Sequence, residues 1–298
     1  MGSTLSRRIV ESLPLLDEIA EYVQPKVQDA VAASGKTVRN ILDGTPLELP
    51  LHPALTDVPI GSWSATFVFD ALDVVGDSKP MRNAADATLA LGIAGGIGAA
   101  VTGLSDWRYL SGGARKMGVA HGLLNTAGLA LSVTSLALRA AGHRNAGRLA
   151  FLVGFSITST AAHLGGELSY EYGLRVNRNA FEHGGPDEFT SVMPESELNG
   201  GEMRRVDFDG VGVLISRSQN GGICTISASC NHFSGPLEQG NREGDTVVCP
   251  WHDSRFNLCT GAVLDGPATF PQSTYETRVR DGNIEIRAAG QNIQKQVR

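Results

Sequence analysis

Residues 230–252 read CNHFSGPLEQGNREGDTVVCPWH, and the two ends of this stretch decide how the second half of the chain is built. Each end offers one thiol and one imidazole, from Cys230 and His232 and from Cys249 and His252. A structural zinc ion uses the same four ligand types, but its usual sequence pairs cysteine with cysteine and histidine with histidine. The alternation favours a binuclear iron–sulfur centre in which two cysteines hold one iron and two histidines hold the other.

Short runs surround the two loops, and several of them are rich in β-branched residues. Turn dipeptides separate the runs, for example Asp209-Gly210 and Asp281-Gly282. This pattern predicts a small antiparallel β-domain. The expected strands are 203–208, 211–216, 223–228, 246–248, 275–280 and 283–286.

These residues resemble the Rieske 2Fe-2S family over the last third of the chain. Further matching positions are Phe256, Thr260-Gly261, Gly266-Pro267-Ala268 and Pro271. The resemblance implies that Cys230 and Cys249 bind one iron, and that His232 and His252 bind the other iron through Nδ1. Neutral imidazoles in place of thiolates raise the reduction potential relative to an all-cysteine ferredoxin.

Departures from the family pattern predict the subtype. Quinol-oxidising members carry a further cysteine in each loop, and these form a disulfide, where this chain has Gly235 and Trp251. Ser254 stands where those members place a serine that hydrogen-bonds a bridging sulfide, but Phe256 replaces their tyrosine. We therefore expect a potential in the lower part of the Rieske range, about −150 to +50 mV. Asp253 replaces the glycine that usually follows the second histidine.

The two remaining cysteines, Cys224 and Cys259, are interpreted as buried small apolar residues, because free cysteine commonly packs in that way. All four cysteines lie in the last quarter of the chain, which argues against a disulfide-stapled secreted scaffold. The net charge of −6 excludes the basic field that nucleic-acid binding needs.

Long apolar stretches mark the first half of the chain. Residues 87–105, 117–138 and 149–166 carry no charge, and a fourth stretch, 58–75, is interrupted by Asp70 and Asp73. Each is long enough to span a bilayer core. Buried helices of a soluble bundle are the alternative, but four stretches in succession favour a transmembrane four-helix bundle.

The predicted fold class is therefore α+β and multidomain, with a four-helix transmembrane bundle followed by a small antiparallel β Rieske domain. The opening Leu51-His52-Pro53 looks like that of an uncharacterised family of four-span bacterial membrane proteins that are sometimes fused to Rieske domains. The expected parts are an amphipathic helical segment at 1–45, the membrane domain at 46–170, a linker at 171–188 and the Rieske domain at 189–290.

Three histidines lie in or beside the spans at the end that carries both termini. They are His52, His121 and His163. His121 and His163 are at matched depth, and serines extend both of their helical faces, which we expect to point inward. The functional interpretation is a site for a b-type haem or a quinone, and the alternative is hydrogen-bonded packing.

These observations predict a membrane-anchored Rieske protein that carries single electrons between redox donor and acceptor proteins, with haem or quinone in the bilayer as a further partner. A quinol-oxidising subunit and a membrane scaffold with structural zinc are the alternatives. A terminal oxygenase would imply a mononuclear-iron domain after His252, and the residues that follow leave no room for it.

Basic residues near the ends of the spans predict the orientation, because cytoplasmic loops carry an excess of lysine and arginine. Seven lie on the side of the termini and five on the other. The expected location is thus the cell membrane, as a multi-pass protein with a cytoplasmic Rieske domain. The seven are Lys36, Arg39, Arg108, Arg115, Lys116, Arg175 and Arg178, and the five are Lys79, Arg82, Arg139, Arg144 and Arg148.

Overall fold

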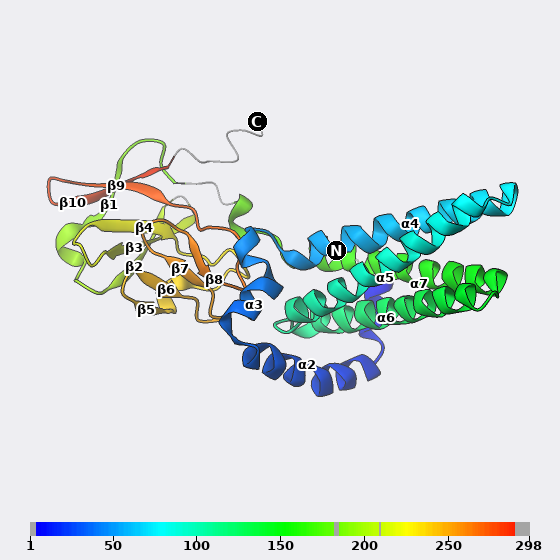
Figure 1. Cartoon of the computed structure of the whole chain (residues 1–298). Coiled ribbons are helices and arrows are strands. Elements are labelled where there is room, and N and C mark those ends of the chain that lie inside the picture. The colour runs from blue at the N-terminus through cyan, green and yellow to red at the C-terminus, as the bar shows by residue number, and fades with distance from the viewer. Residues whose placement is uncertain (1–3, 182–184, 209, 290–298) are drawn as a thin grey trace. The chain divides into compact units, whose positions relative to one another are not determined.

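The structure, a computed structural model, describes residues 4–181, 185–208 and 210–289. The chain divides into two compact units, one formed by residues 1–42 and 50–174 and the other by residues 43–49 and 175–298. The first unit is helical and the second is built of β-strands (Figure 1). The predicted order, a helical bundle followed by a β-domain, is confirmed.

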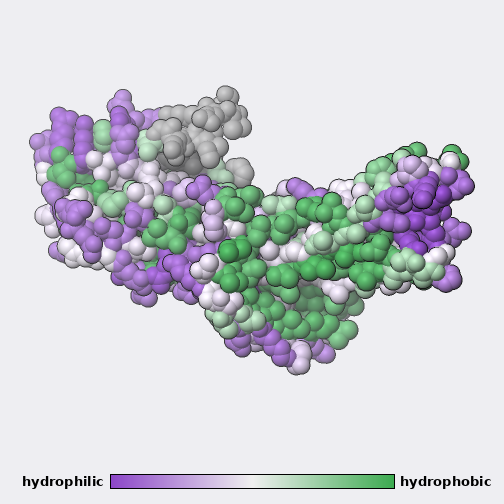
Figure 2. Space-filling model, in the orientation of Figure 1, coloured by the Kyte–Doolittle hydropathy of each residue, from purple (hydrophilic) through white to green (hydrophobic). Residues whose placement is uncertain are grey.

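The helical unit contains four long helices, each long and apolar enough by length and composition to cross a membrane. Apolar side chains cover them in Figure 2. Packing is strongest between α4 and α5 and between α6 and α7, so the bundle consists of two helical hairpins. Shorter helices precede them: α1 (Leu5–Glu11), α2 (Leu15–Ala33) and α3 (Gly35–Asp43). The long helices are α4 (Leu51–Gly76), α5 (Lys79–Trp107), α6 (Gly112–Ala140) and α7 (Arg144–Tyr170).

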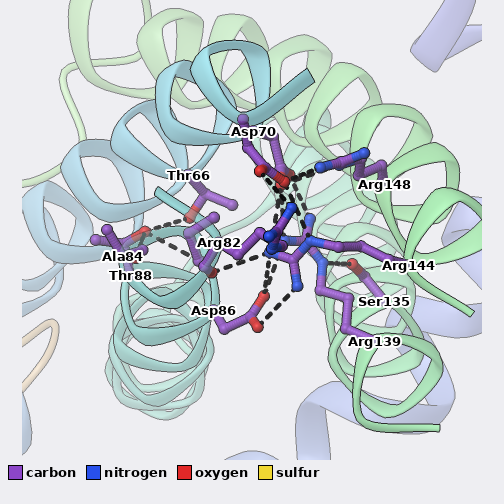
Figure 3. Close-up of polar contacts among 12 residues, drawn as sticks. Thr66, Asp70, Arg82, Ala84, Asp86, Thr88, Ser135, Arg139, Arg144 and Arg148 are labelled. Carbon is purple, nitrogen blue, oxygen red and sulfur yellow. Dashed lines mark hydrogen bonds and ion pairs between the residues drawn. The ribbon is translucent and has the colours of Figure 1, made fainter. Parts of the chain in front are cut away.

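Charged residues gather inside the bundle at the end that carries the loops α4–α5 and α6–α7 (Figure 3). The guanidinium of Arg139 donates to both carboxylate oxygens of Asp70, at 2.9 Å to Oδ1, and the Arg139 side chain is 1% exposed. Asp86 accepts from Arg139 at 3.1 Å and from Arg144 at 3.0 Å. Asp73 accepts from two further arginines, Arg82 and Arg148. The acidic residues that interrupt the first predicted span are therefore neutralised by arginines of the other helices.

The β-unit contains three antiparallel sheets, with strand orders β1-β10-β9, β2-β3-β4 and β5-β6-β7-β8. All six expected strands are present within a residue or two, as β2 (Met203–Phe208), β3 (Val211–Arg217), β4 (Ile223–Ser227), β6 (Thr246–Val248), β9 (Tyr275–Arg280) and β10 (Asn283–Ala288). The sequence patterns missed β1 (Thr190–Pro194), β5 (Asn241–Glu243), β7 (Arg255–Asn257) and β8 (Val263–Asp265). Three of these four strands have only three residues, too few for an alternating pattern.

We expect Arg139→Met to destabilise the helical bundle, because it leaves the carboxylate of Asp70 buried without its main partner. Removing one member of a buried ion pair costs about 3–5 kcal/mol of unfolding free energy. The thermal-unfolding midpoint of the full chain in detergent measures the effect. The double variant Asp70→Leu/Arg139→Met removes both charges and should recover most of the loss. Arg7→Met is the control, since Arg7 pairs with Glu11 at the surface; equal midpoints for Arg139→Met and the wild type would contradict the buried pair.

Candidate metal centre

The first ligand loop follows β4 and is closed by its own backbone. The N–H of Cys230 donates to the carbonyl of Gly235 at 2.8 Å, and the N–H of Ser234 donates back to the carbonyl of Cys230 at 2.7 Å. Ser234 adopts a left-handed backbone, with φ 60°. The loop therefore turns back on itself and presents the residues between Cys230 and Ser234 at its tip.

The second ligand loop, which follows β6, repeats this pattern. The N–H of Cys249 donates to the carbonyl of Ser254 at 2.8 Å, and the N–H of Asp253 donates to the carbonyl of Cys249 at 3.1 Å. Asp253 has φ 61°, the conformation in which glycine is usual and which aspartate tolerates better than most residues. Asp253 thus adopts the left-handed conformation that a glycine would take at this position.

The two thiols meet where the loops face each other. Cys230 is 1% and Cys249 is 2% exposed, and their side chains hydrogen-bond each other within the main core of the β-unit. This hydrogen bond, together with the backbone amides of Trp251 and His252, lowers the pKa of the Cys249 thiol to about 7. Amides placed in this way favour the thiolate, which is the form that binds metal.

The two imidazoles form a second pair at the tips of the same two loops. The ring centroids of His232 and His252 are 5.2 Å apart. Two imidazoles on one tetrahedral metal, at a metal–nitrogen distance of about 2.0 Å, have ring centroids about 5.2 Å apart. His232 is buried, whereas His252 is partly exposed and forms the outer edge of the site.

The arrangement in two pairs distinguishes between the metal alternatives. Among the described residues, no three histidine, cysteine, aspartate or glutamate side chains converge as ligands of a single ion. A mononuclear zinc site would need all four ligands around one point. A thiol pair and a separate imidazole pair instead match the two ligand pairs that a binuclear centre needs, one pair for each metal.

The residues that distinguish the subtype surround the two loops. A Cβ atom at Gly235 would lie 2.8 Å from Sγ of Cys249 and 3.3 Å from the Trp251 ring. The Ser254 hydroxyl accepts from the N–H of Ala268 at 3.0 Å, which leaves its own proton available to an acceptor in the site. Trp251 is 55% exposed, so an aromatic ring covers the outside of the second loop.

The proline-containing loop at residues 266–271 is held by hydrogen bonds from Thr45 and Arg175, two residues outside the sequence motifs. The Arg175 guanidinium donates to the carbonyl of Pro267 at 2.6 Å and to the carboxylate of Asp43 at 2.9 Å. Asp43 is fully buried, and the Thr45 hydroxyl donates to the carbonyl of Ala268 at 3.4 Å. Asp43, through Arg175, and Thr45, which both lie just before α4 in the sequence, are thus linked by hydrogen bonds to the proline-containing loop. The N–H of Ala268 in the same loop donates to the hydroxyl of Ser254.

The interpretation of Cys224 and Cys259 as buried apolar residues is wrong. They are bonded to each other as a disulfide, and Cys259 is exposed. Cys224 belongs to β4, and Cys259 follows β7. A spacing of 35 residues carries no pairing signal, so only the three-dimensional fold brings these cysteines together.

The structure brings two of the three membrane histidines together. His52 and His121 have ring centroids 6.4 Å apart. The side chain of His163 is 70% exposed, and its Nε2 lies 3.4 Å from Glu167. The serines on the His121 face, Ser132 and Ser135, are buried as expected. Those on the His163 face, Ser156 and Ser159, are exposed, so this second polar stripe does not point inward.

The chain is similar to known proteins over both units. Residues 48–178 match the family described as predicted membrane protein (DUF2231), and residues 188–276 match the Rieske [2Fe-2S] domain. Ferredoxin CarAc of Metapseudomonas resinovorans is 31% identical over 95 residues, which are 32% of this chain and 89% of the ferredoxin. The 3-phenylpropionate/cinnamic acid dioxygenase ferredoxin subunit of Shigella flexneri serotype 5b (strain 8401) is 37% identical over 96 residues, with the same coverage.

Among solved structures, the ferredoxin of carbazole 1,9a-dioxygenase from Nocardioides aromaticivorans IC177 is 26% identical. The match covers 34% of this chain and 98% of the ferredoxin, with a TM-score of 0.32.

We expect Gly235→Ala to impair assembly of the metal centre, because the new methyl group would press on Sγ of Cys249. The visible absorption per chain and the iron content should both fall several-fold. Gly222→Ala is the control, since a methyl group there meets only the Ser218 hydroxyl, at 3.5 Å. Full metal loading of Gly235→Ala would contradict the close approach of the two loops.

Proposed function

Because this chain belongs to the Rieske [2Fe-2S] domain family, we propose that it is a membrane-anchored electron carrier in which four side chains hold the cluster. Cys230 and Cys249 would bind one iron, and His232 and His252 would bind the other. The observation that supports this assignment is the separation of the ligands into a thiol pair and an imidazole pair. When bound, a cluster of this type accepts and releases one electron.

The protein's own residues define how the electron would enter and leave. His252 and Trp251 lie at the surface, whereas His232 and the two thiols are buried. A redox partner would therefore approach the imidazole edge at His252. Ser254 would donate its hydroxyl proton to a sulfide of the cluster, and the absence of a tyrosine hydroxyl at Phe256 keeps the expected potential low.

We propose redox proteins as the partners of the exposed edge. Two relatives are ferredoxins by name, one of them the ferredoxin subunit of a dioxygenase. This resemblance supports carriage of single electrons to or from another protein. It favours a carrier over the structural-zinc scaffold, and the absence of a cysteine pair at Gly235 and Trp251 argues against the quinol-oxidising subunit.

The helical unit would anchor the carrier in the lipid bilayer and exchange electrons with a haem or quinone. The four long apolar helices and the match to a predicted membrane protein family support the anchor. The adjacent rings of His52 and His121 support a cofactor site within the bundle.

We expect the purified full chain to contain iron and acid-labile sulfide without zinc, and to give the EPR spectrum of a one-electron-reduced cluster. Its midpoint potential should be about −150 to +50 mV, and a value above about +200 mV would contradict the proposed subtype. His232→Cys should lower the potential of any cluster that still assembles, because a thiolate adds negative charge. His163→Cys is the control and should leave the potential unchanged. Zinc in place of iron would overturn the proposal.

We propose a cytoplasmic Rieske domain, on the basis of the basic residues near the spans. A green fluorescent protein fused to the C-terminus should then be fluorescent, and alkaline phosphatase fused there should be inactive. Fusions in the loop between α6 and α7 should show the reverse and serve as the control. Active phosphatase at the C-terminus would contradict this orientation and would agree with a stable Cys224–Cys259 disulfide, because such bonds persist in oxidising compartments.

A further inference from the structure

The two hairpins of the bundle hold their histidines in the same way. In the first hairpin, Nδ1 of His52 on α4 donates to the carbonyl of Ala99 on α5 at 2.8 Å. The His52 ring lies against Gly103, one helical turn further along α5, where a Cβ would be only 2.9 Å from the ring. The second hairpin repeats the bond at 2.8 Å and the close glycine at 2.9 Å with His121, Ala161 and Gly165.

The sequences of the hairpins agree with this correspondence. Aligned on Ala99 and Ala161, α5 and α7 both carry Arg-Asn-Ala in their first two turns, at 82–84 and 144–146. Aligned on the histidines, Asp70 of α4 takes the position of Arg139 of α6. These two residues at corresponding positions bind each other (Figure 3). The two hairpins therefore match at these positions, as expected of an internal duplication with a two-fold axis that passes near the Asp70–Arg139 pair at one end of the bundle and the histidine pair at the other.

The distance between the histidines fits a metal ion on this axis. Two imidazoles on opposite sides of one metal, each about 2.0 Å away, have ring centroids about 6.4 Å apart. His52 and His121 are 6.4 Å apart, with ring planes at 89°. The ring centroids of His232 and His252, by contrast, are 5.2 Å apart. That shorter distance fits two neighbouring positions on a tetrahedral metal.

The hydrogen bonds of the two rings also favour metal ligation. Because Nδ1 of each ring donates to a backbone carbonyl, Nε2 of each ring carries a lone pair. Histidine ligands of metals commonly show this second bond to a carbonyl, which fixes the tautomer and the ring orientation. Two lone pairs cannot hydrogen-bond each other, whereas one metal ion accepts both. In this structure the lone pair on Nε2 of His121 accepts a hydrogen bond from the side-chain amide of Asn125 at 3.1 Å, and this amide would have to turn aside when a metal binds.

We propose that His52 and His121 bind one transition-metal ion between them, through Nε2, either as the axial ligands of a haem iron or as ligands of a bare ion. A role of this ion in electron exchange rests on the proposed function, whereas the binding of the ion by His52 and His121 is independent of that function. The glycines at 103 and 165 seat the rings, and the duplication places one ligand on each hairpin.

The full chain, purified from membranes in mild detergent, tests the proposal through its visible spectrum, its haem content by pyridine extraction and its total metals. We expect a haem Soret band, or a stoichiometric metal beyond the cluster iron. His52→Ala and His121→Ala should each abolish this signal. His163→Ala, which alters the exposed histidine, should retain it. Addition of hemin or cuprous ion to metal-free protein should restore the haem or metal signal in the wild type and in His163→Ala, but not in His52→Ala or His121→Ala.

The outcomes separate this proposal from the proposed function. The EPR signal of the reduced cluster is recorded on every sample as a readout of the β-unit, and an unchanged helical circular-dichroism signal and thermal-unfolding midpoint show that the helical unit of His52→Ala and His121→Ala folds. A Soret band identifies haem, and bound metal without it identifies a bare ion. The proposal is overturned if the wild type binds neither, if both alanine variants retain the metal, or if a quinone is lost from them in place of a metal. A missing cluster signal with metal still bound at the histidines would overturn only the electron-carrier function.

Discussion

The contact between the thiols of Cys230 and Cys249 is the interaction on which the β-unit depends. It joins two loops that share one backbone pattern. In each loop the cysteine N–H donates to the carbonyl five residues further on, and the residue just before that carbonyl has a left-handed conformation. Because the loops match, their histidines also come to lie side by side. The close approach favours glycine at position 235, because a Cβ atom there would lie 2.8 Å from Sγ of Cys249.

The helical unit is organised around a different constraint, the cost of charged and polar groups in an apolar bundle. The arginines and aspartates near one end neutralise each other across the hairpins. At the other end, His52 and His121 direct Nδ1 to carbonyls of the neighbouring helices. In both sets two residues at corresponding positions of the two hairpins face each other, Asp70 and Arg139 at one end and His52 and His121 at the other.

The sequence was sufficient to predict the parts whose signal is local. Uncharged stretches predicted the four long helices, and runs of β-branched residues predicted most strands. The assignment of the cluster ligands from the alternation of Cys and His stays a prediction. Three features were not predicted from the sequence, because each depends on residues that are far apart in the sequence and that only the fold brings together. Asp43 and Arg175 form an ion pair, although one precedes and the other follows the membrane domain in the sequence. Cys224 and Cys259 form a disulfide, but no sequence motif indicates their pairing.

The internal duplication was the third missed feature. The histidines recur after 69 residues and the Arg-Asn-Ala segments after 62, because Ala99 follows His52 by 47 residues whereas Ala161 follows His121 by 40. No single repeat period therefore appears in the sequence. The structure reveals the correspondence because each histidine bonds to an alanine carbonyl on its neighbouring helix.

Mixed ligation by two thiolates and two imidazoles is the central claim, and pulsed EPR of the reduced full chain grown with ¹⁵N-histidine tests it most directly. The account predicts that two nitrogen nuclei couple strongly to the cluster and that both couplings change with the isotope. A reduced cluster without coupled histidine nitrogens would contradict it.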